Sequence, residues 1–144
     1  MATFAPALGF RSSKREHRIV IIDGPNMTNL GARNKRVYGA IASLEDLQNF
    51  CKNFGAAVGV TVATFASNYE GAILEFIHQS AQSADAYIIN PAGLTVGGVA
   101  TKHALTETGR PSRCISRTSS HHPRLPAACR LDHGSPHSAP VPQV

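Results

Sequence analysis

The chain has 144 residues and a formal net charge of +5. That length is typical of a single domain with one hydrophobic core. Five arginines and one aspartate stand between Arg110 and Val144, so nearly all of the excess positive charge lies in that segment. The charge therefore gives no reason to expect a nucleic-acid partner for the rest of the chain. No apolar run is long enough to cross a bilayer, so no membrane partner is expected.

The first residues and the cysteines bear on location. Residues 1–17 have too short an apolar stretch for a secretory signal and are interpreted as a mobile leader. The three cysteines are odd in number and have no metal-type spacing. These features favour a reducing interior, so a cytoplasmic location and no bound metal are predicted.

Strand and helix patterns alternate between Arg18 and Gly109. Apolar runs at 18–23, 60–66 and 86–90 predict buried strands. Helices are predicted within 43–59, 67–82 and 97–109, with Ser43 as an N-cap, capping-box spacing of Ser67 and Glu70, and a stop at Gly109. In the first helix the apolar residues at helical spacing are Leu44, Leu47, Phe50, Cys51 and Phe54. The alternation predicts an α/β fold with a parallel sheet, of flavodoxin-like or Rossmann-like type.

The pattern changes at Pro111. Residues 110–144 hold six of the nine prolines and four of the seven histidines, and they contain no aromatic residue. Neither a period of 2 nor one of 3.6 extends over a useful length there. The composition predicts that residues 112–144 form a disordered Pro/Ser/Arg/His-rich tail, which leaves the sheet with about three strands.

Polar loops follow all three predicted strands. In a parallel sheet these loops meet at one edge, which is where sites form in such folds. The loop at 23–39 is long and polar, and glycines in the third loop allow backbone N–H groups to approach an anion at a helix N-terminus. Asn26, Asn68 and Asn90 are candidate binding residues, although each of them could instead satisfy a turn.

Three segments carry a family resemblance in their order and spacing. They are IDGPNMTNLGARNKRVYG at 22–39, SNYEGAILEFIH at 67–78 and INPAGLTVGGVATKHAL at 89–105. Together they resemble type II 3-dehydroquinate dehydratase over residues 18–111. The resemblance implies a flavodoxin-like three-layer fold, a homo-oligomer built as a dodecamer of trimers, and no cofactor. It also implies the loss of water from the substrate 3-dehydroquinate, which gives 3-dehydroshikimate in the shikimate or quinate pathway.

The resemblance assigns roles to four residues. Tyr38 matches a tyrosinate that removes a proton beside the ketone, and Arg33 matches the arginine that favours its ionised form. A free tyrosine ionises near about pH 10, so a close cation is needed to make phenolate a usable base at neutral pH. Asn26 matches a residue that helps hold the water stabilising the enolate, and Asn90 matches a substrate-binding position. Glu70 and His78 also match family positions, but capping and helix packing explain them.

The chain departs from the family pattern in the third loop and after it. Val96 stands where the family has a histidine that binds substrate hydroxyls, and Lys102-His103 replaces an Arg-Asp pair. After Pro111 the family continues into a fourth strand with Glu-Val-His, whose histidine is the general acid. Read from the third base of the Ser112 codon, the codons available for residues 112–118 permit Glu-Val-His-Ile-Ser-Asn. We therefore hypothesise that the tail is translated out of frame.

Three functional interpretations remain open from the sequence. The first is a 3-dehydroquinate dehydratase relative, catalytically impaired in this chain. The second is a divergent lyase that acts on another small hydroxy acid or ketone. The third is a non-catalytic pseudoenzyme that binds a ligand or joins an oligomer. The loss of hydroxyl-binding chemistry at Val96 fits both of the latter, and a frame error fits the first.

Overall fold

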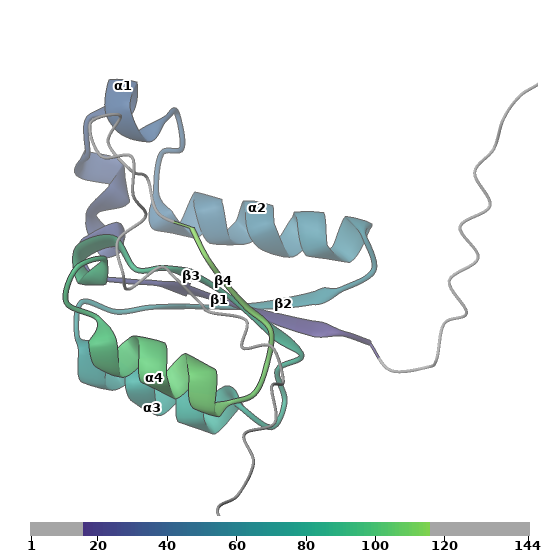
Figure 1. The fold of residues 1–144 in the computed structure, drawn as a ribbon. Coiled ribbons are helices and arrows are strands. Elements are labelled where there is room, and N and C mark those ends of the chain that lie inside the picture. Colours follow the sequence, from purple (N-terminus) through teal and green to yellow (C-terminus); the bar gives the residue numbers. More distant parts are fainter. Residues whose placement is uncertain (1–15, 116–144) are drawn as a thin grey trace, which may run out of the picture.

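The fold is a parallel sheet between two helical layers. The computed structural model describes residues 16–115. Its sheet has the strand order β2-β1-β3-β4, with all neighbours parallel. The strands are β1 Arg18–Asp23, β2 Thr61–Ala66, β3 Ala86–Asn90 and β4 Ser112–Cys114. The helices are α1 Lys35–Tyr38, α2 Leu44–Ala57, α3 Glu70–Ser80 and α4 Val99–Glu107, with 3₁₀ turns η1 Met27–Ala32 and η2 Ala92–Leu94. In Figure 1, α2 lies on one face of the sheet, and α3 and α4 lie together on the other.

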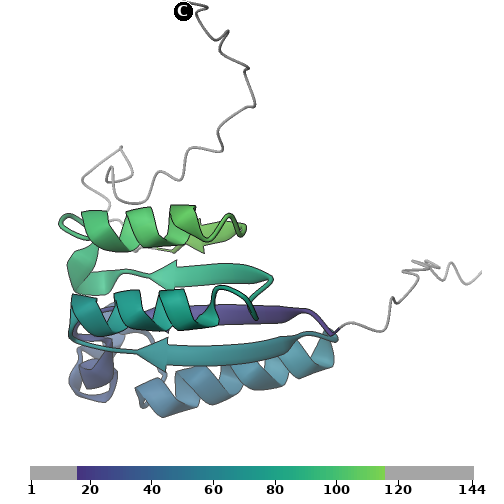
Figure 2. The same cartoon turned by 90° about the horizontal axis from the view of Figure 1, so that it is seen from below.

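The first three strands and three main helices confirm the predicted α/β alternation. β1 and β3 have the predicted bounds, and β2 begins one residue later than predicted. Ser43 caps α2, since its Oγ accepts a hydrogen bond from the backbone N–H of Asp46 at 3.0 Å. Gly109 has a φ of 63°, the left-handed conformation that commonly follows a helix and that favours glycine. Figure 2, seen from the α3 and α4 side, shows the strands running in one direction.

The hydrophobic core lies between the sheet and the α3–α4 layer. Side chains alternate across a strand, so every second residue of β1 and β3 points to this face. The buried cluster consists of Val20, Ile22, Ile73, Ile77, Ala84, Tyr87, Ile89, Ala104 and Leu105. The hydroxyl groups of Tyr87 and Ser80 lie 2.8 Å apart, so the one aromatic ring in this cluster also has its polar atom satisfied.

The apolar residues of α2 lie on two faces of the helix. Their helical spacing in the sequence is typical of a single apolar face, which the structure does not show. Leu44, Leu47 and Cys51 are partly buried, whereas Phe50 and Phe54 are 65% and 61% exposed. The helix approaches the sheet through the buried Gly55, which contacts the side chain of Val62 on β2 and has no room for a Cβ atom. Since this approach fixes the rotation of α2, its two phenylalanines point to solvent and pack on each other, with ring centroids 6.4 Å apart.

The predicted capping box of α3 is wrong. α3 begins at Glu70, so its N-cap position is Tyr69; Ser67 lies two residues earlier, and its Oγ accepts from the N–H of Tyr69 at 3.0 Å. The Glu70 carboxylate instead accepts from the backbone N–H and the hydroxyl of Thr101, at 3.3 and 2.9 Å. Glu70 therefore caps α4, and this tertiary contact replaces the local one.

A fourth strand corrects the prediction of about three strands and of disorder from Ser112 onward. β4 pairs with β3 in the register Tyr87↔Ser112 to Ile89↔Cys114. The Ile115 N–H donates to the Ile89 carbonyl oxygen at 2.8 Å. Ladder bonds use backbone atoms, so a segment without a β-strand composition can add to an open sheet edge. The domain thus extends beyond residue 111, and residues 116–144 of the predicted tail lie outside the described residues.

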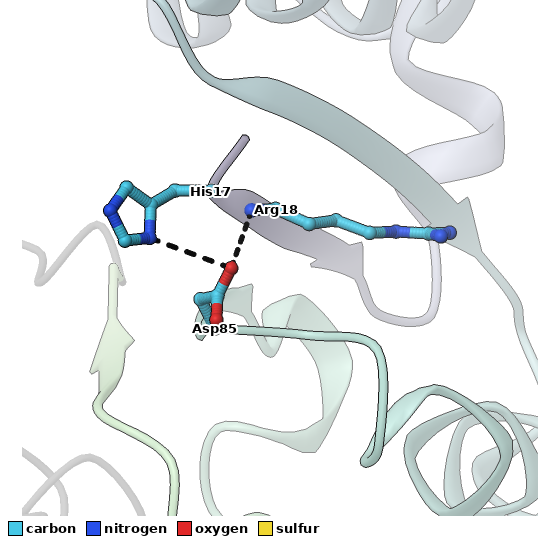
Figure 3. A network of polar contacts seen from close by, with 3 residues as sticks. All are labelled: His17, Arg18 and Asp85. Atoms are coloured by element: carbon cyan, nitrogen blue, oxygen red, sulfur yellow. Dashed lines mark hydrogen bonds and ion pairs between the residues drawn. The ribbon is translucent and has the colours of Figure 1, made fainter. Parts of the chain in front are cut away.

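The fold also begins earlier than predicted, because His17 belongs to it rather than to the leader. Its carbonyl oxygen accepts from the Thr61 N–H at 2.9 Å. Figure 3 shows the Asp85 carboxylate between two neighbours: Oδ2 accepts from the Arg18 N–H at 2.8 Å and lies 3.6 Å from His17 Nδ1. Residues 1–15 of the predicted leader lie outside the described residues.

Asp85 joins the starts of β1 and β3, so its removal should lower stability. We expect Asp85→Ala to lower the free energy of unfolding by about 1–2 kcal/mol, because the Arg18 N–H loses a charge-assisted acceptor. Asp85→Asn keeps an acceptor oxygen and should lose less. Urea denaturation of both variants measures this difference, and equal losses would contradict the role given to the hydrogen bond.

Across residues 16–115, no helix has the length and apolar character needed to span a membrane.

Candidate functional site

Three loops meet at the carboxyl edge of the sheet, as predicted. The Gly24 N–H donates to the Asn90 carbonyl oxygen at 2.8 Å, and the Gly93 N–H donates to that of Pro25 at 3.2 Å. These two bonds join the loop after β1 to the loop after β3. The site is therefore built from segments far apart in the sequence, held together mainly by backbone contacts.

Asn26 and Asn68 come together across the first and second loops. Asn26 has a φ of 74°, a left-handed conformation that asparagine tolerates better than most residues. Its N–H donates to the Asn68 Oδ1 at 2.8 Å, and the Asn68 Nδ2 donates to the Thr28 hydroxyl at 3.0 Å. Asn68 therefore satisfies the turn, as the alternative interpretation of these residues had it. Asn26 is exposed, which leaves its amide at the surface of this edge.

The side chain of Asn90 contacts a carboxylate and makes no hydrogen bond to that pair. Asp23 and Asn90 end β1 and β3 and are register partners. The Asn90 Nδ2 donates to the Asp23 Oδ1 at 3.2 Å. Asp23 is 3% exposed, and this burial raises the pKa of its carboxyl group, while the hydrogen bond from Asn90 lowers the pKa by a smaller amount.

Asp23 lies at this edge of the sheet and was not among the candidate residues of the sequence analysis. The signal was present, since a carboxylate stands at the end of a buried strand directly before Gly24-Pro25. Asp23 is one residue beyond Ile22 on β1, so its side chain points to the α2 face of the sheet, where Cys51 on α2 also lies. Burial, and to a smaller extent the charge of Asp23, raises the pKa of Cys51.

The raised pKa of Asp23 predicts a pH-dependent cost in stability. In the unfolded chain this carboxyl ionises near its ordinary value of 3.8, whereas in the folded chain it keeps its proton to higher pH. The folded state then binds more protons across that window, so stability falls as pH rises through the folded pKa and stays lower above it. We expect Asp23→Asn to raise the free energy of unfolding by roughly 1–2 kcal/mol at neutral pH.

The same variant should gain little at a pH below the unfolded value. Urea denaturation of both proteins across the acid to neutral range measures the difference. A gain that does not depend on pH would show that charge burial at Asp23 is not its cause.

The predicted catalytic pair lies in the long first loop, which folds as η1 followed by the single turn α1. Arg33 is half-buried directly after η1, and its Nη1 lies 4.0 Å from the Met27 sulfur. Tyr38 is the last residue of α1, and its side chain lies outside the described part of the structure. The contact of Arg33 with Tyr38 therefore stays a prediction.

The third loop presents an apolar residue to solvent. Val96, which follows η2, is 88% exposed. The predicted anion site at the start of the next helix is partly occupied from within, because Glu70 already accepts from the Thr101 N–H in the first turn of α4. His78 is exposed on α3 and does not belong to this edge.

One cavity lies nearby, on the opposite face of the sheet. It measures about 20 Å³ and is lined by Ile89, Pro91, Leu94, Gly98, Thr101, Lys102, Leu105 and Cys114. That volume accommodates no more than a water molecule. A ring-sized ligand therefore does not fit in this cavity.

Comparison with known proteins relates the chain to type II dehydroquinases. Residues 17–116 match the family model described as dehydroquinase class II. The chain is 42% identical over 88 residues to a 3-dehydroquinate dehydratase of Roseiflexus castenholzii, covering 61% of this chain and 55% of that protein. It is 40% identical over 89 residues to catabolic 3-dehydroquinase 1 of Fusarium vanettenii, covering 62% of this chain and 61% of that protein.

A solved structure agrees with these sequence matches. The type II dehydroquinase of Butyrivibrio crossotus superposes with a TM-score of 0.62 at 29% identity, covering 70% of this chain and 69% of that one. The chain thus spans about three fifths of the length of the curated relatives it matches. The matched proteins are hydro-lyases by name, and the matched segment includes all four predicted site residues.

Proposed function

Because this chain belongs to the dehydroquinase class II family, we propose that it binds 3-dehydroquinate at the carboxyl edge of the sheet and dehydrates it poorly. One observation carries the proposal: Asn26 and Asn90, matched to family binding positions, lie on two loops that the Gly24–Asn90 and Gly93–Pro25 hydrogen bonds hold together. The amides can therefore act on a single ligand. The proposed reaction needs no cofactor, since it moves protons and releases water.

The proposed first step is removal of the proton beside the ketone. Tyr38 would act as the base, with Arg33 in the same loop favouring its phenolate form. Asn26 would help hold a water that donates to the enolate oxygen, which is the usual way to stabilise such a charge. Asn90 would bind a ring hydroxyl of the substrate.

The second step, protonation of the departing hydroxyl, is where the chain should fail. The family resemblance places the general-acid histidine on the fourth strand. β4 and Ile115, which follows it, consist here of Ser112, Arg113, Cys114 and Ile115, without a histidine among these described residues. General acid catalysis is worth on the order of 10²–10⁴ in rate, so we expect its loss to slow turnover by a similar factor.

A second candidate function rests on Val96. Its exposure on the third loop, where the family has a hydroxyl-binding histidine, favours a ligand with fewer hydroxyl groups. The chain would then be a divergent lyase for another small hydroxy acid or ketone, or a pseudoenzyme that binds without turnover.

Assembly into trimers and dodecamers and a cytoplasmic location are proposed with the family assignment. Light scattering of the purified chain tests the assembly.

Calorimetric titration with 3-dehydroquinate tests the leading proposal. We expect saturable binding by the chain, and about tenfold weaker binding by Asn90→Ala, because one hydrogen bond to the ligand is lost. Asn53→Ala, on the exposed side of α2, is the matched control and should bind like the unaltered chain. Binding that is absent, or equal in all three proteins, would overturn the proposal.

A further inference from the structure

The Asp23–Asn90 pair has properties that a purely structural contact would not need. Asp23 is 3% exposed, and no lysine, arginine or histidine within residues 16–115 forms an ion pair with it. A buried carboxylate without a cation costs stability, whereas a neutral side chain of the same shape would avoid that cost. Within residues 16–115 the carboxylate accepts one side-chain hydrogen bond, from the amide of Asn90, which matches a substrate-binding position.

The chemistry of the contact fixes the orientation of that amide. An ionised carboxylate only accepts hydrogen bonds, so the NH₂ end of the Asn90 side chain must face Asp23. The carbonyl end then points away, and Oδ1 receives no hydrogen bond from any donor of the described segment. Asn90 is half-buried at the edge where the three loops meet, so its free acceptor is presented to a ligand there.

We propose that Asp23 is a positioning residue that determines specificity, because it locks Asn90 as an acceptor for a ligand hydroxyl. Without this lock the amide can rotate and offer its NH₂ group, which prefers carbonyl and carboxylate oxygens. The negative charge of Asp23 also repels a ligand carboxylate from this corner of the site. The two effects together orient a hydroxylated acid with a hydroxyl over Asn90 and its carboxylate elsewhere.

The neighbours of Asp23 do not supply a competing charge. β2 offers Ala66 as its register partner, and η1 begins with Met27. On α2 the Cys51 thiol is close enough for the charge of Asp23 to act on it, and its raised pKa keeps it neutral at physiological pH. The ionisation of Asp23 itself is therefore the variable that sets the state of the Asn90 amide.

Two ligands separate this role from simple support of the fold. 3-Dehydroquinate carries a carboxylate, a ketone and ring hydroxyls, whereas 3-oxocyclohexane-1-carboxylate keeps the first two and lacks the hydroxyls. We expect the unaltered chain to prefer 3-dehydroquinate, and Asp23→Asn to reduce that preference about tenfold by weakening 3-dehydroquinate binding alone. Glu45→Gln, which removes an exposed carboxylate in the first turn of α2, should leave the preference unchanged.

The pH dependence gives a readout that general loosening would not produce. The preference of the unaltered chain should fall toward that of Asp23→Asn as the medium is made acid and Asp23 gains its proton. The hydroxyl beside the carboxylate makes 3-dehydroquinate the stronger acid of the two ligands. The ratio measured with Asp23→Asn contains this ligand protonation without the titration of Asp23, so it serves as the reference at each pH. Affinities that fall together for both ligands, or a preference that Asp23→Asn retains, would overturn the positioning role.

The inference rests on the proposed function, and one further measurement keeps the two apart. The NMR signals of the Asn90 side-chain amide should shift with the protonation of Asp23 in the unaltered chain and stay constant with pH in Asp23→Asn. If the unaltered chain binds neither ligand, the proposed function fails. If it binds 3-dehydroquinate but the Asn90 amide signals ignore the acid titration, the positioning role alone is overturned.

Discussion

Gly24→Ala should unfold the site and lower the free energy of unfolding by about 2–4 kcal/mol. A Cβ atom at Gly24 would run into the carbonyl oxygen and carbon of Pro91. Both are backbone atoms, so no rotamer change relieves the collision. The loops after β1 and β3 would have to separate, which breaks the hydrogen bond from the Gly24 N–H to the Asn90 oxygen. Binding of 3-dehydroquinate should be lost together with stability.

Gly71→Ala provides the matched control. Gly71 lies in the exposed first turn of α3, and a Cβ there meets no atom within 4 Å. Alanine favours a helix over glycine by up to about 1 kcal/mol, so this variant should be neutral or slightly stabilised. Urea denaturation and ligand titration of the two variants test the close approach, and similar behaviour of both would refute it.

Arg33→Met should slow proton removal from 3-dehydroquinate by about 100-fold or more, because the Tyr38 phenol then ionises far above neutral pH. This step can be followed in the present chain without the general acid. In D₂O, a base that removes and returns the proton beside the ketone replaces it by deuterium. The NMR signal of that ligand proton should therefore fade in the presence of the unaltered chain.

The pH profile identifies Arg33 as the cause. Exchange by Arg33→Met should recover as the medium becomes alkaline, since hydroxide can ionise the phenol that the guanidinium no longer assists. Arg33→Lys keeps a cation and should retain part of the rate, while Arg36→Met, an exposed position on α1, should exchange like the unaltered chain. An undiminished rate in Arg33→Met would exclude the proposed base pair.

The sheet could be predicted from the sequence as far as its strands carry an apolar signature. β1 and β3 match their predicted bounds because each apolar run ends directly before turn residues, Gly24-Pro25 after β1 and Pro91 after β3. β4 carries no such signature, since Ser112, Arg113 and Cys114 join through backbone hydrogen bonds to β3. A strand that depends on an available sheet edge cannot be found from its own residues.

Helix rotation and helix capping depended on contacts between distant segments. Phe50 and Phe54 fit the helical period of α2, but the close approach of Gly55 to Val62 turns them outward. Ser67 and Glu70 have the spacing of a capping box, but Glu70 forms its hydrogen bonds with Thr101 on α4. Local spacing gives the existence of a helix more reliably than the partners of its side chains.

The meeting of the three loops could be predicted from the sequence, whereas the contacts of their side chains could be predicted only in part. The edge and the meeting of three loops follow from strand order, because parallel strands end together. The structure joins Asn26 to Asn68, whereas Asn90 turns to Asp23, a residue with no assigned role in the sequence reasoning. That pair arises from the β1–β3 register, which a sequence without strand pairing does not contain.

The ultraviolet absorbance of the enone product, 3-dehydroshikimate, tests the central claim most directly. The assay compares this chain with a version whose reading frame is restored after Pro111, at equal concentrations and with 3-dehydroquinate as substrate. We predict that the restored chain forms product faster by about 100-fold or more, since it regains the general-acid histidine. Equal rates from the two chains, or no product from either, would contradict the account.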